Sequence, residues 1–101
     1  MALYLVIGFD RHPHQMPLRD SVRPEHRSYV LGHAEKLRMA GAMVDDSGNQ
    51  QGTMLVFEAD SAEEVWAWVR AEPFYQAGVY ETLAVRKWDL VIGAIAERPK
   101  A

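Results

Sequence analysis

The segment from Leu3 to Asp10 restricts the possible folds of this chain more than any other part of the sequence. Alternate residues of a β-strand point to opposite sides, and here both sides are largely apolar. One side carries Leu3, Leu5, Ile7 and Phe9, and the other carries Tyr4, Val6 and Gly8. Since a strand of this kind needs cover on both sides, we expect it to lie centrally in a sheet whose two faces are both covered.

A loop with two prolines follows, and then a pattern that predicts a helix from about Ser21 to Ala40. Pro24 suits the first turn of such a helix, where a missing N–H costs little. Gly41 suits the position just after its end. Apolar and ring side chains recur at spacings of three and four, so they share one face: His26, Tyr29, Val30, His33 and Leu37.

The next part of the chain predicts two strands and a second helix. The strands are expected at Ala42–Asp45 and Thr53–Ala59, on either side of a turn rich in Asp, Gly and Asn. Ser61 and Glu64 have the spacing of a capping box, in which the serine accepts an N–H of the first turn. The helix that begins there should run to about Ala71.

The last part contains a connector and a final strand. Pro73 disfavours helical angles at Glu72, so this helix should stop and a short connector, of one helical turn at most, should follow. We expect a long strand from about Tyr80 to Ile95 and a frayed tail from Glu97 to Ala101.

The expected order is therefore β-α-β-β-α-β, which is the split βαβ motif of ferredoxin-like α+β folds. Such a fold has an antiparallel sheet with both helices on one face. The other sheet face would also carry apolar side chains, and a bare apolar face is a pairing surface. We therefore expect a homodimer in which two sheets pack face to face.

The composition limits the domain count and the function classes. The 101 residues argue for a single domain, residues 1–101. The net charge of −3 gives no basic surface for nucleic acid and disfavours an anionic membrane. The chain has no cysteine, which excludes disulfides, thiolate catalysis and cysteine metal sites. The sequence shows neither a signal peptide nor a transmembrane segment, so we expect a cytoplasmic protein.

Several segments, in order along nearly the whole chain, resemble the YciI-like family. They are Arg23-Pro-Glu-His26-Arg-Ser-Tyr29, the Asp45–Gly48 turn, Asp60–Glu64, the Glu72–Val79 segment and Trp88. The Glu72 segment is similar to the D-P-[FY]-x-x-A-G-[VL] signature of the family. Glu72 departs from that pattern, because its side chain is one methylene longer than the aspartate of the signature.

The resemblance implies a dimeric α/β barrel with a pocket between the sheet and the first helix of each subunit. It also implies that His26 and Glu72 form a histidine–acid dyad in that pocket. One relative of this type is a dehydrochlorinase acting on a chlorinated hydroquinone, a reaction that needs proton transfer and no metal. Muconolactone isomerases and antibiotic-synthesis monooxygenases have related folds.

His26 is the first candidate for chemistry, because an imidazole can take and return a proton near neutral pH. A carboxylate on one ring nitrogen, here that of Glu72, would fix its tautomer and strengthen it as a base. The competing interpretation is a histidine buried in the core with its hydrogen bonds satisfied. Arg23 could bind an anionic substrate and Tyr29 a ligand hydroxyl, or they could be a surface salt bridge and a core aromatic residue.

Other residues suggest a metal, but more weakly. His12 and His14 lie in one loop, and His26 or His33 could join them, since a specific site needs three or four ligands. A solvated loop explains the pair equally well, and we expect no metal. The sequence has no glycine-rich nucleotide motif, so we also expect no cofactor.

Two hypotheses from different classes remain for the function. The first is a cofactor-independent enzyme that uses His26 and Glu72 for isomerisation or elimination on a small organic molecule, positioned by Arg23 and Tyr29. The alternative is a non-catalytic dimeric module that binds a small ligand or assists another protein. Oxygen-dependent chemistry, as in monooxygenases of this fold, is a weaker third hypothesis because fold alone says little about function.

Overall fold

Strand β1 (Ala2–Asp10) lies inside a four-stranded antiparallel sheet in the computed structural model, which describes residues 2–95. It pairs with β3 (Gln50–Ala59) along one edge and with β4 (Tyr80–Trp88) along the other. Strand β2 (Leu37–Val44) pairs with the far edge of β3, which gives the order β2-β3-β1-β4. The predicted central position of the first strand is confirmed.

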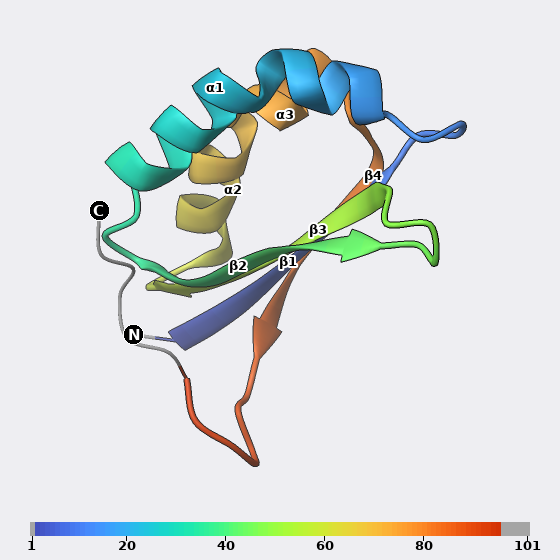
Figure 1. Cartoon of the computed structure of the whole chain (residues 1–101). Helices are drawn as coiled ribbons and strands as arrows, with labels where there is room; N and C mark the ends of the chain where they lie inside the picture. The colour runs from blue at the N-terminus through green and yellow to red at the C-terminus, as the bar shows by residue number, and fades with distance from the viewer. Residues whose placement is uncertain (1, 96–101) are drawn as a thin grey trace.

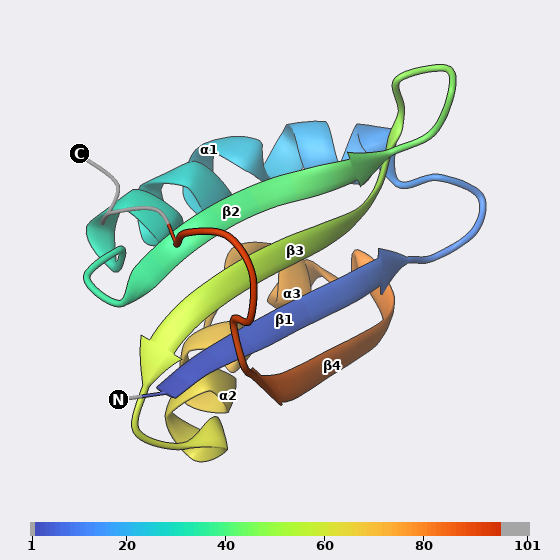
Figure 2. The same ribbon diagram turned by 90° about the horizontal axis from the view of Figure 1, so that it is seen from below.

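Helices α1 (Met16–Gly32), α2 (Ala62–Arg70) and α3 (Pro73–Ala77) all lie over one face of this sheet (Figure 1). The view from below shows the other face, on which no helix lies within the described chain (Figure 2). The order βαββαβ, with the short α3 before the last strand, is the predicted ferredoxin-like α+β fold, and this prediction is confirmed.

The two sides of β1 have different surroundings. Tyr4 and Val6 point towards the helices and are buried, in register with Phe57 and Leu55 of β3. These side chains form the main core together with residues of α2 and β4. On the opposite side, Phe9 is 55% exposed. The sheet therefore has an inner face, which the helices cover, and an outer apolar face.

Helix α1 begins and ends earlier than the sequence predicts, so the expected range Ser21–Ala40 is wrong at both ends. Pro17 lies in its first turn, and Pro24 lies inside the helix. A proline lacks an N–H, and its ring clashes with the preceding turn inside a helix. The first turn of a helix accommodates both features at the lowest cost. The start signal in the sequence was therefore Pro17 and not Pro24.

Residues 37–40 belong to β2 and not to the first helix, and Gly41 lies within that strand. Leu, Arg, Met and Ala all favour helices, but the propensity of a few residues is weak compared with tertiary pairing. Here Leu37 is buried and pairs with Phe57 of β3. Gly41 is also not among the glycines with positive φ, so it does not end a helix.

The second half of the chain follows the prediction more closely. Ser61 caps α2, since its hydroxyl accepts the backbone N–H of Glu64 at 3.3 Å. The carboxylate of Glu64 reaches back to the N–H of Asp60, at 3.1 Å, one residue before the cap. The predicted second helix and its Ser61 cap are thus confirmed, whereas Glu64 binds the N–H of Asp60 and not that of the cap residue.

Strand β4 ends at Trp88, so the predicted strand to Ile95 is wrong for residues 89–95. Trp88 pairs with Leu3, near the start of β1, and no described residue of β1 pairs with the chain after Trp88. The chain then turns beneath the outer face of the sheet as an arm, residues 89–95 (Figures 1 and 2). Val91 and Ile92 of this arm are 81% and 89% exposed. The predicted frayed tail, 97–101, lies outside the described residues.

None of the helices between residues 2 and 95 has both the length and the apolar composition needed to cross a bilayer.

Candidate functional site

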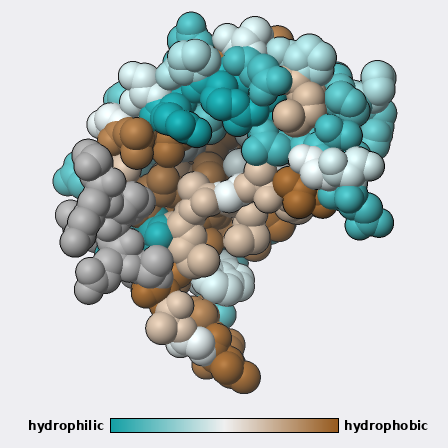
Figure 3. Space-filling model, viewed as in Figure 1, coloured by the Kyte–Doolittle hydropathy of each residue, from teal (hydrophilic) through white to brown (hydrophobic). Residues whose placement is uncertain are grey.

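A cavity of about 490 Å³ lies between α1 and the sheet. Figure 3 shows this hollow, with hydrophilic residues of the helical layer above it and more apolar residues of the sheet below it. Helix α1 contributes Arg19, Arg23, His26, Arg27, Val30 and Leu31, the sheet contributes Ala40, Gly41, Ala42, Gln50, Thr53 and Leu55, and α3 contributes Phe74. The cavity therefore has a basic upper wall and a mainly apolar floor.

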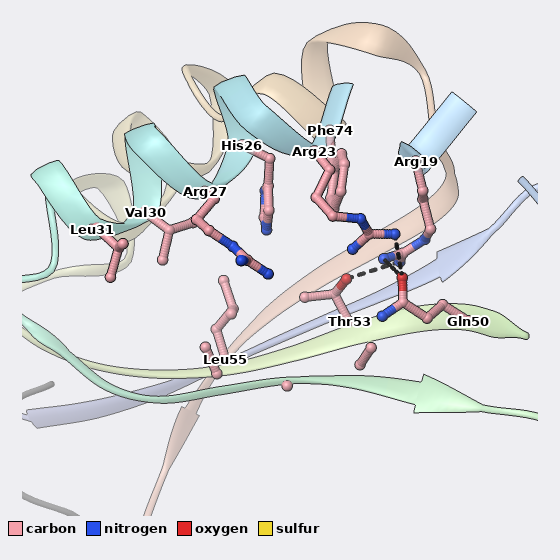
Figure 4. Close-up of a pocket in the computed structure, with 13 residues that line it drawn as sticks. Arg19, Arg23, His26, Arg27, Val30, Leu31, Gln50, Thr53, Leu55 and Phe74 are labelled. Carbon is pink, nitrogen blue, oxygen red and sulfur yellow. Dashed lines mark hydrogen bonds between the residues drawn. The ribbon is translucent and has the colours of Figure 1, made fainter. Parts of the chain in front are cut away.

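His26 points from α1 into this cavity, between Arg27 and Arg23 (Figure 4). Its Nδ1 is hydrogen-bonded to Oε1 of Glu72. Its ring stacks on Phe74, with the ring centroids 3.8 Å apart and the planes 10° from parallel. These two contacts fix the orientation of the imidazole, and they leave Nε2 as the ring nitrogen available to the cavity.

Glu72 is buried, with 4% of its surface exposed, and its carboxylate has two roles. Pro73 favours extended angles at Glu72, which has φ −75° and ψ 131°. Its carboxylate caps α3, accepting the N–H of Phe74 at 3.0 Å and that of Tyr75 at 3.2 Å. The same carboxylate binds His26, so the side chain that starts α3 also orients the imidazole.

A buried ion pair between Arg19 and Asp10 lies at the cavity wall. Arg19 binds Asp10 with two hydrogen bonds, Nε to Oδ2 at 2.6 Å and Nη2 to Oδ1 at 3.0 Å. Arg19 Nη2 also donates to Thr53 Oγ1 at 3.0 Å. The Tyr80 hydroxyl donates to the same Thr53 oxygen at 2.9 Å, and burial raises the pKa of Tyr80 well above its usual range. The tyrosine therefore stays protonated as a donor.

Among residues 2–95, the buried polar or charged side chains are Asp10, Arg19, Thr53 and Glu72. Two of them line the cavity, and the other two bind residues that line it. Buried ionisable groups with partners are costly to place, and in proteins they gather at functional sites. Their concentration here marks this cavity as the candidate site.

Arg23 lies on the cavity wall, as do Gln50 of β3 and Arg27. Arg23 Nη2 donates to Gln50 Oε1 at 3.1 Å and to Asp20 Oδ1 at 3.0 Å. The structure therefore brings three of the four sequence-predicted site residues together: His26, Glu72 and Arg23.

Tyr29 is the predicted site residue that the structure places elsewhere. Its hydroxyl donates to the backbone oxygen of Trp68 at 2.8 Å, and its ring stacks on His33 at 4.4 Å between centroids. Burial, and then the negative charge of Glu72, raise the pKa of Tyr29. Tyr29 does not line the cavity, because it is used in packing α1 against α2.

His12 and His14 of the loop do not form a metal site with any other described residue. Within residues 2–95 no group of three or more His, Cys, Asp or Glu side chains is arranged to hold a metal ion. His14 Nδ1 instead accepts the backbone N–H of Met16 at 3.3 Å.

Sequence reasoning missed Arg27, Gln50 and Thr53 as cavity residues. One signal could have found the first of them: Arg19, Arg23 and Arg27 recur at intervals of four, which places them on one helix face. Gln50 and Thr53 had no such signal, because only the register of the sheet brings them under α1.

Comparison with known proteins gives a family match. The model of the YCII-related domain matches residues 2–89 of this chain. Protein YciI of Escherichia coli O6:H1 is 32% identical over 97 residues, which cover 88% of this chain and 98% of that protein. Protein YciI of Shigella flexneri matches with the same identity and coverage.

Solved structures with a similar fold include enzymes. 5-Chloro-2-hydroxyhydroquinone dehydrochlorinase from Burkholderia phenoliruptrix, in complex with 2,5-dihydroxybenzoquinone, superimposes with a TM-score of 0.76 and 28% identity. The match covers 86% of this chain and 93% of that enzyme. An antibiotic biosynthesis monooxygenase superimposes with a TM-score of 0.53 and 15% identity, over 91% of this chain and all of that one. The fold is that of the dimeric α/β-barrel superfamily.

Proposed function

Because the chain belongs to the YCII-related domain family, we propose that it is a small enzyme that performs general acid–base chemistry with His26 and Glu72. The reaction is an isomerisation or an elimination on a small organic molecule, which proton transfer alone can carry. Arg23 positions the substrate. Tyr29 is left out of the proposed site because its hydroxyl is bound to the backbone of Trp68.

The observation that carries this proposal is the hydrogen bond between His26 Nδ1 and the buried carboxylate of Glu72. With Nδ1–H donating to the carboxylate, Nε2 presents its lone pair to the cavity. Nε2 can then take a proton from an acidic O–H of the substrate or from a C–H of its keto tautomer, and the electron pair of that bond moves into a C=O or C=C double bond. In an elimination the leaving group departs with its own bonding pair, and in an isomerisation Nε2–H returns the proton to a different atom.

The dehydrochlorinase relative supports an elimination as the first reaction to test. Its name describes the loss of hydrogen chloride from a chlorinated hydroxyhydroquinone, and its structure contains a dihydroxybenzoquinone. A cavity of about 490 Å³ is large enough for a single-ring compound.

The test is turnover of 5-chloro-2-hydroxyhydroquinone and other small hydroxylated aromatics, followed by absorbance. We expect His26→Ala to reduce kcat by about 10²–10⁴-fold, the usual contribution of a positioned proton carrier. His33→Ala is the control, because His33 lies at the end of α1 outside the cavity. Equal activity of the His26 variant and the wild type, on any substrate that is turned over, would exclude the proposed mechanism.

A non-catalytic ligand-binding module is the second candidate, and the capping contacts of Glu72 favour it, since they give this carboxylate a structural reason to be present. Binding and turnover, measured side by side, separate the two. For an enzyme, Glu72→Gln, which keeps an oxygen for the cap but loses the charge, should still bind the substrate and turn it over more slowly. A module should bind small aromatic compounds with no turnover in either protein.

We also propose that the protein is a homodimer in which two outer sheet faces pack together. The outer face exposes large apolar side chains, including Phe9 at 55%, Met39 at 41% and Met54 at 38%. Light scattering should give twice the mass of one chain for the wild type and the mass of one chain for Phe9→Asp. Ala67→Asp, on the exposed side of α2, is the matched control and should stay dimeric. A wild-type protein with the mass of one chain at micromolar concentration would overturn this proposal.

A further inference from the structure

We infer that the cavity binds a small organic anion, an acidic oxygen group attached to an apolar body, and that Arg27 selects the charge of this ligand. The inference rests on the proposed function in taking this cavity as the ligand site. It adds the chemical class of the ligand and a residue that determines specificity.

The charge around the cavity is unbalanced. Its described lining includes three arginines and no carboxylate, in a chain whose net charge is −3. Arg19 is neutralised by Asp10 behind the wall. Among the described residues, Asp20 is the carboxylate that pairs with Arg23, and its side chain is 62% exposed, so solvent screens that pair. No carboxylate of the described residues lies within ion-pair distance of Arg27, which leaves an uncompensated positive charge beside His26.

The neutral polar groups of the cavity are also set to donate. Gln50 Oε1 accepts from Arg19 Nη1 at 3.3 Å and from Arg23 Nη2 at 3.1 Å (Figure 4). Because guanidinium groups can only donate, these contacts fix the amide orientation and leave its NH₂ group as a donor to the cavity.

The hydroxyl of Thr53, like the amide of Gln50, has its acceptor positions occupied and its donor free. Thr53 Oγ1 accepts from Arg19 Nη2 at 3.0 Å and from the Tyr80 hydroxyl at 2.9 Å. Both lone pairs of Thr53 Oγ1 are thus occupied, and within residues 2–95 the hydroxyl proton of Thr53 meets no acceptor. Since the side chain is largely buried and lines the cavity, that proton is available to a ligand oxygen.

The remaining walls restrict the rest of the ligand. Val30, Leu31, Leu55 and Phe74 present carbon surfaces, which favour an apolar ring or short chain. The acceptor oxygens of Gln50 and Thr53 are already occupied, so among the described cavity side chains Nε2 of neutral His26 is the acceptor left for a ligand. A ligand with several acceptor oxygens, a negative charge and a compact apolar body satisfies this arrangement, whereas a cation or a donor-rich ligand does not.

Binding of benzoate and benzamide tests the inference, because the two probes share size and shape and differ in charge. Calorimetry or NMR at low ionic strength should show benzoate binding at least about tenfold more tightly, the effect of one charge-assisted hydrogen bond. Added salt should reduce this preference, because Arg23 and Arg27 are at least partly exposed to solvent. Arg27→Gln should remove most of the preference, and Arg27→Lys should keep part of it.

The control is Arg70→Gln, because Arg70 lies over Trp66, outside the cavity, and its loss should leave both affinities unchanged. His26→Gln should also retain the preference for benzoate, so anion binding is read separately from proton transfer. The inference is overturned if both probes bind equally, if Arg27→Gln keeps the full preference, or if neither probe binds at millimolar concentration.

Discussion

The two longer helices lie over the same face of the sheet but meet it in different ways. Helix α2 buries Val65 and Val69 against β3 and β4, in one continuous apolar core. Helix α1 is longer, and the structure describes all of its residues. Only one of them is buried, the charged Arg19. Between α1 and the sheet lies the cavity.

This difference separates the molecule into a solid half and a hollow half. The solid half, under α2, is filled by aliphatic and aromatic side chains, whose burial supplies most of the folding free energy. The hollow half, under α1, holds the buried Arg19–Asp10 ion pair, the hydrogen bond between His26 and Glu72, and the candidate site. The comparison teaches that apolar packing is concentrated under α2 and buried polar groups under α1, so substitutions in the two halves should affect stability for different physical reasons.

The largest expected effect is in the solid half. Phe57 is 3% exposed and meets the ring of Trp68 edge-on, with centroids 4.6 Å apart. Phe57→Ala should lower the free energy of unfolding by about 3–5 kcal/mol, since it leaves a cavity in a packed core. Leu31→Ala, in the hollow half where the side chain is 47% exposed, should cost less than about 1 kcal/mol. Urea denaturation measures both, and equal costs would remove the distinction between the halves.

The second effect tests the ion pair behind the cavity. Arg19→Met leaves Asp10 buried without its partner and should cost about 3 kcal/mol, the lower end for such a loss, because water in the cavity can reach the site. Adding Asp10→Asn removes the stranded charge and should recover part of this cost. A double variant as unstable as Arg19→Met alone would show that charge is not the cause. Thermal denaturation of the three proteins gives the comparison.

A smaller effect is expected where the cavity meets α3. Glu72→Ala removes the cap of this helix and should cost about 1–2 kcal/mol, as other lost N-caps do. Glu72→Gln retains an acceptor oxygen and should cost less, while still removing the charge from His26. If both variants lose the same stability, the cap does not depend on the oxygen. Chemical denaturation distinguishes these outcomes.

The smallest effect is a pH dependence on the surface of the solid half. Lys36 hydrogen-bonds the Glu64 carboxylate, and this contact, followed by the N–H of Asp60, lowers the pKa of Glu64. Because the pKa of Glu64 is lower in the folded state, its contacts add stability at pH values above the unfolded pKa of about 4.5. That stability is lost as the pH falls through the folded-state pKa. The melting temperature of the wild type should therefore exceed that of Glu64→Gln at pH 7 and approach it near pH 3.

Much of the fold could be predicted because local and tertiary signals agree. The β1 strand, apolar on both sides and central in the sheet, and the helix cap at Ser61 each correspond to what the structure contains. The end of α1 could not be predicted, because Leu37 to Ala40 favour a helix locally and join β2 only through pairing with β3. The early end of β4 likewise depends on the length of its partner.

Part of the candidate site was also accessible from the sequence. His26, Glu72 and Arg23 were identified from motif order, and the structure brings them together. Arg27 was not identified, because a charged residue on a packed helix usually faces solvent. In α1, arginines instead line the cavity that faces the sheet. Thr53 could not be found, because its importance comes from contacts with Arg19 and Tyr80, far away in sequence.

The way in which the imidazole of His26 is held has a stereochemical consequence. Its ring cannot rotate without breaking the bond to Glu72 and the stacking on Phe74, and both oxygens of Glu72 are already engaged. A single nitrogen must then collect a proton and deliver it from one fixed direction. An isomerisation at this site would be suprafacial, with hydrogen leaving and re-entering on the same side of the substrate plane.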